Sequence, residues 1–158
     1  MEITNPVDPD GLHALTQCFG DFGSAHSYIK SSLAQCLAHE GPSHSSAIIT
    51  ANAKTAQKGL KVSLLLRGVN MPDIVQVESA FTLDAIPDVK KSIVRPETKL
   101  TQAHLEDLTF PLVDAPVEIL LGADVISKFP ITESRIGKSD SPSDFHLVIG
   151  LCLGRRAV

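Results

Sequence analysis

The chain has no tryptophan, one tyrosine and six phenylalanines among its 158 residues. Leucine, isoleucine, valine and alanine must therefore build most of the core, and the 43% of apolar residues is enough for one packed domain. Basic residues form no stripe, and acidic residues outnumber them by 18 to 14. A protein with this charge is poorly suited to bind a phosphate backbone, so we expect no nucleic-acid partner.

Long apolar runs and paired cysteines are also missing. No run approaches the roughly 18 residues that a helix needs to cross a bilayer, so we expect no membrane association. The first residues are acidic and include Pro6, whereas a signal peptide begins with a positively charged region that is followed by an apolar region. The three cysteines are odd in number and widely spaced, which does not fit a disulfide framework. These features predict a cytoplasmic protein.

Familiar metal and nucleotide motifs are incomplete in this sequence. Cys36, His39 and His44 lie close together, but no second pair of ligands follows to complete a structural zinc site. We therefore expect Cys36 to be a small core residue of a helix. Residues 21–23 read Asp-Phe-Gly, as in protein kinases, yet too few residues precede them for the glycine-rich loop and lysine of a kinase. We expect no metal and no cofactor.

One segment has clear helical periodicity. Between residues 27 and 40, apolar side chains recur at intervals of three and four residues, which places them on one face of a helix. Ser27 is a suitable N-cap, and Gly41 with Pro42 provides a stop. We therefore predict an amphipathic helix over residues 27–40.

The remaining apolar patterns predict strands. Alternation is clearest in residues 75–81, and the run at 117–121 is continuous, as in a strand buried on both faces. Residues 1–13 read as a loose N-terminal segment, and residues 132–144 read as a loop. The other expected elements are strands at 14–19, 47–50, 60–66 and 145–153 and short helices at 101–108 and 123–128. This order predicts a mainly β chain that folds as a barrel or sandwich.

Two turns contain the acids of most interest. Asp21 is followed by Gly23 and Ser24, and this pattern alone fits an Asx turn ahead of a helix. Gly122 ends the continuous apolar run and is followed by Asp124. An acid at that place fits the first turn of a helix, where the helix dipole favours it.

Taken together, the segments around these turns resemble the aspartic peptidase domain of Bel/Pao-type retrotransposons. Residues 21–29 are similar to the family's Asp-Ser-Gly-Ser turn and to the Ser-Phe/Tyr-Ile step that follows it. Residues 108–124 are similar to its proline-bearing approach to Ile-Asp-Leu-Leu-Ile-Gly-Ala-Asp, and residues 149–154 to its closing Gly-Trp-x-x-x-Gly strand. The similarity runs from about residue 14 to residue 154. Residues 14–154 are therefore expected to form the aspartic-peptidase-like domain.

The resemblance implies a retropepsin-like closed β barrel that acts as a homodimer, with one helix after the Asp21 turn and a short helix after Gly122. Asp21 of each subunit would form the catalytic dyad, and Gly23 and Ser24 would contact a polypeptide substrate. Two carboxylates a few Å apart cannot both ionise, so one activates water while the protonated one polarises the scissile carbonyl. The implied function is polyprotein processing by a retrotransposon-derived aspartic endopeptidase. The implied fold also sets the Asp21 turn in a groove, close beside residues 120–122.

Three features depart from the family pattern. Phe22 stands where members have Ser or Thr, whose hydroxyl bonds across the dimer. The flap corresponds either to residues 51–53, which contain no glycine, or to a tip nearer Gly59, and Leu151 replaces the terminal Trp. We therefore predict impaired activity, and we expect Phe22→Ser or Phe22→Thr to improve dimerisation. The alternative is a catalytically inactive retropepsin-like dimerisation or binding module, and a third interpretation is a partly folded fragment without function.

Overall fold

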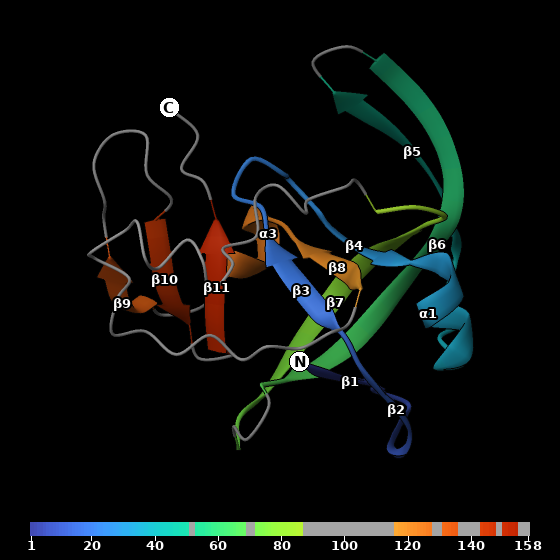
Figure 1. Cartoon of the computed structure of the whole chain (residues 1–158). Coiled ribbons are helices and arrows are strands. Elements are labelled where there is room, and N and C mark those ends of the chain that lie inside the picture. The colour runs from blue at the N-terminus through green and yellow to red at the C-terminus, as the bar shows by residue number, and fades with distance from the viewer. Residues whose placement is uncertain are drawn as a thin grey trace.

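The computed structural model describes residues 1–50, 53–68, 72–86, 116–127, 131–135, 143–147 and 150–154 (Figure 1). The strands of the larger sheet are β1 (Glu2–Asn5), β2 (Asp8–Leu15), β3 (Gln17–Gly20), β4 (Ser27–Lys30), β5 (Ser43–Thr50), β6 (Ala53–Arg67), β7 (Ile74–Leu83) and β8 (Val117–Leu121). The strands of the smaller sheet are β9 (Ile131–Arg135), β10 (Ser143–Leu147) and β11 (Gly150–Gly154). The described helices are α1 (Ser31–Cys36) and α3 (Ala123–Ile126).

The larger sheet curls into half of a barrel (Figure 1). Its strands follow the order β2-β1-β6-β7-β4-β8-β3, and β5 pairs with the first part of β6. Most neighbouring pairs are antiparallel, but β3 is parallel to β8 and β4 is parallel to β7. The smaller sheet has the order β11-β10-β9, and its strand β11 lies beside β3 (Figure 1). Over the described residues, the prediction of a mainly β chain is therefore confirmed.

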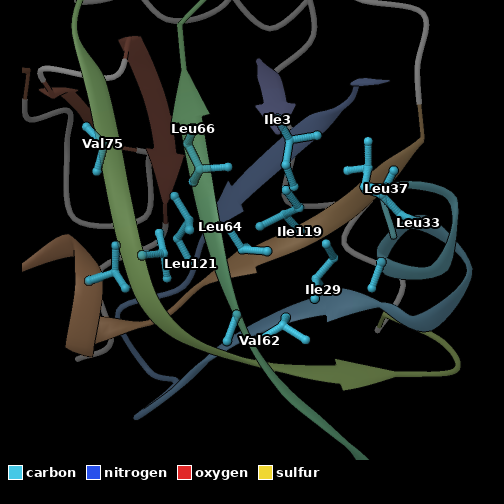
Figure 2. Close-up of a cluster of buried hydrophobic side chains, with 14 of the residues drawn as sticks. Ile3, Ile29, Leu33, Leu37, Val62, Leu64, Leu66, Val75, Ile119 and Leu121 are labelled. Atoms are coloured by element: carbon cyan, nitrogen blue, oxygen red, sulfur yellow. The ribbon is translucent and has the colours of Figure 1, made fainter. Parts of the chain in front are cut away.

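Alternation along the strands explains the core. In β6, Val62, Leu64 and Leu66 are buried, while the residues between them are partly exposed. In β7, Val75 and Val77 alternate with exposed side chains in the same way. Figure 2 shows aliphatic side chains from these strands gathered with others from β1, β4, β8 and α1. Full burial of each such side chain contributes roughly 1.5–3 kcal/mol, so this cluster fixes the positions of the strands that carry the candidate site.

The structure matches the predicted strand β8 to the residue. Ile119, Leu120 and Leu121 are all buried, with exposed fractions of 5% or less. Successive side chains of a strand point to opposite faces, so both faces of β8 are covered here, and the strand needs apolar side chains at successive positions rather than at alternate ones. Gly122 then ends the strand and α3 follows, as predicted.

The predicted helix over residues 27–40 is wrong at both ends, because α1 spans only Ser31–Cys36. Residues 27–30 form β4, which pairs with β7 on one side and β8 on the other. Ile29 is buried because it points from β4 into the core, although its spacing to Leu33 also suits a helix. The helix α1 begins only at Ser31, and Ser27 is not its N-cap. Tertiary pairing has overridden a local pattern here.

The expectation of a loose segment at residues 1–13 is also wrong. These residues form β1 and most of β2, an antiparallel hairpin whose first strand pairs with β6. Ile3 is fully buried in the core, and the side chain of Asn5 donates to the carbonyl oxygens of Leu37 and Ala38 at 3.2 and 2.9 Å. A polar composition hid this hairpin, because only alternate residues of β1 face inward.

The described C-terminal residues form more strands than their sequence pattern predicts. Residues 145–153 were expected to form one strand, but they contribute to the hairpin of β10 and β11, in which Leu147 pairs with Gly150. The expected loop at 132–144 includes most of β9 and the start of β10. The expected strand at 60–66 begins earlier than predicted, since residues 53–59 also belong to β6. The expected helix at 101–108 and residues 51–52 of the expected flap lie outside the described residues.

Neither described helix is long and apolar enough to cross a bilayer.

Candidate active site

Two turns meet at one edge of the larger sheet. β3 leads into Asp21 and β8 leads into Gly122, and these two strands run parallel with Gly20 beside Leu121. Strands that run in the same direction end at the same edge, so the two turns lie side by side. The N–H of Asp21 donates to the carbonyl oxygen of Leu121 at 2.8 Å, and the N–H of Ala123 donates to that of Ser24 at 2.8 Å. The predicted contact between the turns is therefore confirmed, whereas the groove in front of Asp21 stays a prediction.

The Asp21 turn is held by its own carboxylate. The N–H of Gly23 donates to Oδ1 of Asp21 at 2.9 Å, and the N–H of Ser24 donates to the Asp21 carbonyl oxygen at 3.1 Å. This is the expected Asx turn. Asp21 is partly exposed and Gly23 is exposed, so the carboxylate sits at the surface of the turn, within reach of a ligand. All three predicted site residues thus lie in one turn.

A buried serine joins the two turns. Ser27 has no exposed surface, and its hydroxyl donates to Oδ1 of Asp124 at 2.9 Å. The same hydroxyl oxygen accepts the N–H of Gly122 at 3.0 Å, while the N–H of Ser27 donates to Oδ2 of Asp124 at 3.3 Å. Asp124 therefore binds the strand that follows the Asp21 turn, and Ser27 binds the turn that follows β8.

This connection was missed from the sequence. Asp124 does lie in the first turn of α3, as predicted, but a helix of four residues has little dipole to interact with. Its larger role is to accept two hydrogen bonds from Ser27. The available signal was that a small polar residue and an acid lie in the two segments that carry the resemblance, residues 21–29 and 108–124.

Gly122 is required by the close approach of the two turns. A Cβ atom at this position would collide with the backbone of His26. Any other residue would push the Asp21 loop away from the end of β8. The glycine therefore has a spatial reason in this structure, independent of any family pattern.

Phe22 faces its own subunit. The side chain is partly buried and packs against the hydrophobic core cluster. In the expected dimer this position would face the two-fold axis with a hydroxyl. The Phe22 ring therefore makes apolar contacts within its own chain, whereas a Ser or Thr hydroxyl here would make a polar contact between the two chains.

The three residues weighed as metal ligands have separate surroundings. Cys36 is exposed at the end of α1, so its expected place in the core is wrong, because the buried face of this segment is formed by Leu33, Ala34 and Leu37. His39 is buried, its Nε2 atom has no hydrogen-bond partner, and burial lowers the pKa of its imidazole. His44 stacks on Phe81. Among the described residues, no group of three or more His, Cys, Asp or Glu is placed to hold a metal ion.

Comparison with known proteins gives no match: no family model matches the sequence, and no curated protein or solved structure is significantly similar to the chain. The function must therefore be inferred from the residues and geometry described above.

Proposed function

We propose that this chain is a retropepsin-like, retrotransposon-derived aspartic endopeptidase domain whose active site forms across a homodimer. The observation that carries the proposal is the parallel pairing of β3 with β8, which sets the Asp21 turn against the Gly122 turn. The Ser27–Asp124 hydrogen bonds then fix one turn to the other. Such a support holds an acid in a defined place, which general acid–base catalysis requires.

The chemistry needs two copies of Asp21. One carboxylate in each chain approaches its symmetry mate, and only one of the two stays ionised, because like charges a few Å apart repel. The ionised member accepts a proton from the attacking water, and the protonated member donates to the oxygen of the scissile carbonyl. The proton is shared, so the dyad titrates as a pair. A two-fold axis beside the Asp21 turn supplies this arrangement with one acid per chain.

Gly23 and Ser24 are placed to contact the substrate backbone in this proposal. Gly23 is exposed at the tip of the turn and offers no side chain that would obstruct a peptide. The hydroxyl of Ser24 donates to the carbonyl oxygen of His26 at 2.8 Å and so stiffens the loop beside Asp21. A rigid turn costs less to order when a peptide binds.

Phe22 supports a second candidate function. The ring lacks the hydroxyl that would join two subunits, and it packs against the core of its own chain. A domain that keeps the interlocked turns but loses this contact can serve as a catalytically inactive retropepsin-like dimerisation or binding module. The two candidates share a fold and differ in whether Asp21 acts on a peptide.

Cleavage of a peptide library at pH 4–6 separates the two candidates. Wild-type protein is expected to show weak, pepstatin-sensitive cleavage that Asp21→Asn abolishes. Asp73→Asn removes an exposed carboxylate ahead of β7 and is the matched control, which should leave cleavage unchanged. Sedimentation of the same samples reports dimerisation. A folded dimer that cleaves nothing would support the inactive module, and cleavage that survives Asp21→Asn would remove Asp21 from the mechanism.

A further inference from the structure

Four aromatic rings cluster on one face of the sheet, at β4 and its neighbour β7, and β4 is the strand that follows the Asp21 turn. We define the ring cluster as His26, Tyr28, His44 and Phe81. The imidazole of His44 stacks on Phe81 with 4.2 Å between centroids, and His26 meets the same ring edge-on at 5.3 Å. Tyr28 lies 6.2 Å from Phe81 in a tilted arrangement. Both imidazoles thus contact one phenyl ring.

The strand pattern places these rings on the side of the sheet away from the core. In β4, Ser27 and Ile29 are buried, so Tyr28 points to the opposite face. Tyr28 pairs in register with Phe81, and directly paired residues of neighbouring strands project to the same side. His26 is exposed, and the other three rings are partly exposed. The cluster is therefore open to a ligand.

A glycine brings His44 onto this face. His44 pairs with Gly59 of β6, and a Cβ atom on Gly59 would collide with the backbone of Thr82 in β7. The N–H of Leu60 also donates to the hydroxyl of Thr82 at 2.8 Å. β5 and β6 therefore approach β7 closely enough for the imidazole to stack on Phe81.

The ring cluster is continuous with the candidate active site. His26 lies five residues after Asp21, and its carbonyl oxygen accepts the hydroxyl of Ser24 at 2.8 Å. Its backbone also lies against Gly122. An extended peptide that passes Asp21 can therefore place a neighbouring side chain over the rings, since each residue advances about 3.3 Å.

Charged groups around the rings favour an anionic side chain. Lys61 pairs in register with Phe81 and so projects to the same face. Lys30 is paired with Glu118 at 3.7 Å, and Asp84 accepts the hydroxyl of Ser31 at 3.1 Å.

One acid near the rings acts against this balance, because the charge of Asp124 reaches Tyr28. Asp124 directs its carboxylate to Ser27. The pKa of Tyr28 is raised by burial and by the nearby Asp124, so its phenol stays neutral and can donate a hydrogen bond. Histidine in general gains its positive charge in mildly acidic solution, where glutamate side chains remain largely ionised.

We infer that the ring cluster is a subsite for an acidic side chain of a peptide substrate, held by His26 and His44 beside Phe81. This inference rests on the proposed function for its substrate class. The rings supply apolar contact for the methylene groups of a glutamate, and the two imidazolium groups supply donors for its carboxylate. Because histidine in general is charged only in mildly acidic solution, we expect the selectivity to disappear near neutral pH.

Tyrosine fluorescence offers a direct test, because the chain has one tyrosine and no tryptophan. Tyr28 lies within the ring cluster, so its emission reports binding there without any cleavage. Asp21→Asn protein is titrated with alanine-rich octapeptides that carry a single Glu, Gln or Phe and no Tyr. At pH 5 the Glu peptide is expected to bind roughly threefold to tenfold more tightly than the Gln peptide, as one or two half-exposed charged hydrogen bonds allow. At pH 7.5 the two affinities should converge.

Matched variants complete the test. His26→Gln with His44→Gln should remove the preference for Glu at pH 5, whereas His13→Gln changes an exposed histidine of β2 and should preserve it. Equal binding of Glu and Gln peptides at pH 5, or a preference for the Phe peptide at both pH values, would overturn the inference. Wild-type cleavage of the same peptides is measured separately. Glu-selective binding without cleavage supports the subsite while it counts against the peptidase, and cleavage without Glu selectivity does the reverse.

Discussion

The hydrogen bonds between Ser27 and Asp124 make the sharpest prediction of this structure. Ser27→Ala removes the hydroxyl that accepts the buried N–H of Gly122 and donates to Oδ1 of Asp124. Ser27 has no exposed surface, so water cannot easily replace the lost oxygen. A buried donor left without a partner costs about 1–3 kcal/mol, and we expect the free energy of unfolding to fall by that amount.

Asp124→Asn tests the same contact from the other side. The substitution keeps the shape of the side chain but replaces one acceptor oxygen with an NH₂ group. One of the two bonds from Ser27, either to its hydroxyl or to its N–H, must then be lost. We expect a loss of about 1–2 kcal/mol, and because both substitutions break the same contact, the double variant should lose less than the sum of the two.

Urea unfolding of both single variants and the double variant measures these quantities. Ser63→Ala is the matched control, because its hydroxyl also donates across strands, to the carbonyl oxygen of Glu78 at 2.9 Å, but at an exposed position. Its cost should stay within about 0.5 kcal/mol. If Ser27→Ala costs no more than Ser63→Ala, or if its effect simply adds to that of Asp124→Asn, the two turns are not interlocked as described.

Two further predictions concern Phe22 and His39. Phe22→Thr should lower the unfolding free energy of the monomer by roughly 1–2 kcal/mol, because a partly buried ring leaves the core. The same substitution should tighten the dimer through a hydroxyl worth about 0.5–1.5 kcal/mol per bond, and symmetry counts that bond twice. Thermal unfolding and sedimentation separate the two effects, and an unchanged dimer dissociation constant would refute the hydroxyl argument. Burial lowers the pKa of His39 below its ordinary value of about 6.5, so the folded state binds fewer protons than the unfolded state. The contribution of His39 to stability should therefore be intact above pH 6.5 and should fall as the pH drops from there toward the folded pKa. His39→Gln should flatten this part of the stability profile in urea midpoints taken from pH 7.5 to pH 5, and an unchanged slope would contradict the assignment.

The sequence predicted the elements whose pattern has a single structural solution. A continuous apolar run that ends at a glycine fits a strand that is buried on both faces, and β8 has three successive buried residues. Alternation predicted β7 for the same reason, because its buried face repeats every second residue. The meeting of the Asp21 and Gly122 turns came from the resemblance, since no local pattern relates positions so far apart.

The remaining elements were hidden for identifiable physical reasons. Ile29 and Leu33 are four residues apart in a strand and a helix respectively, and their spacing could not show that the chain changes conformation between them. The hairpin of β1 and β2 contains so few buried residues that its composition resembles a loop. The bond between Ser27 and Asp124 spans 97 residues, and each partner taken alone has a common local explanation.

That separation has a consequence for the order in which the molecule assembles. Contacts between distant segments form late in folding, because a long loop must close before they contribute any stability. The Asp21 turn is supported by Asp124 only when β8 has paired with β3 and β4. A nascent chain that ends before residue 124 therefore contains Asp21 without the contacts that position its turn. The Asp21 site is therefore complete only when the sheet is complete, and under the proposed function this dependence would delay peptidase activity until the domain has folded.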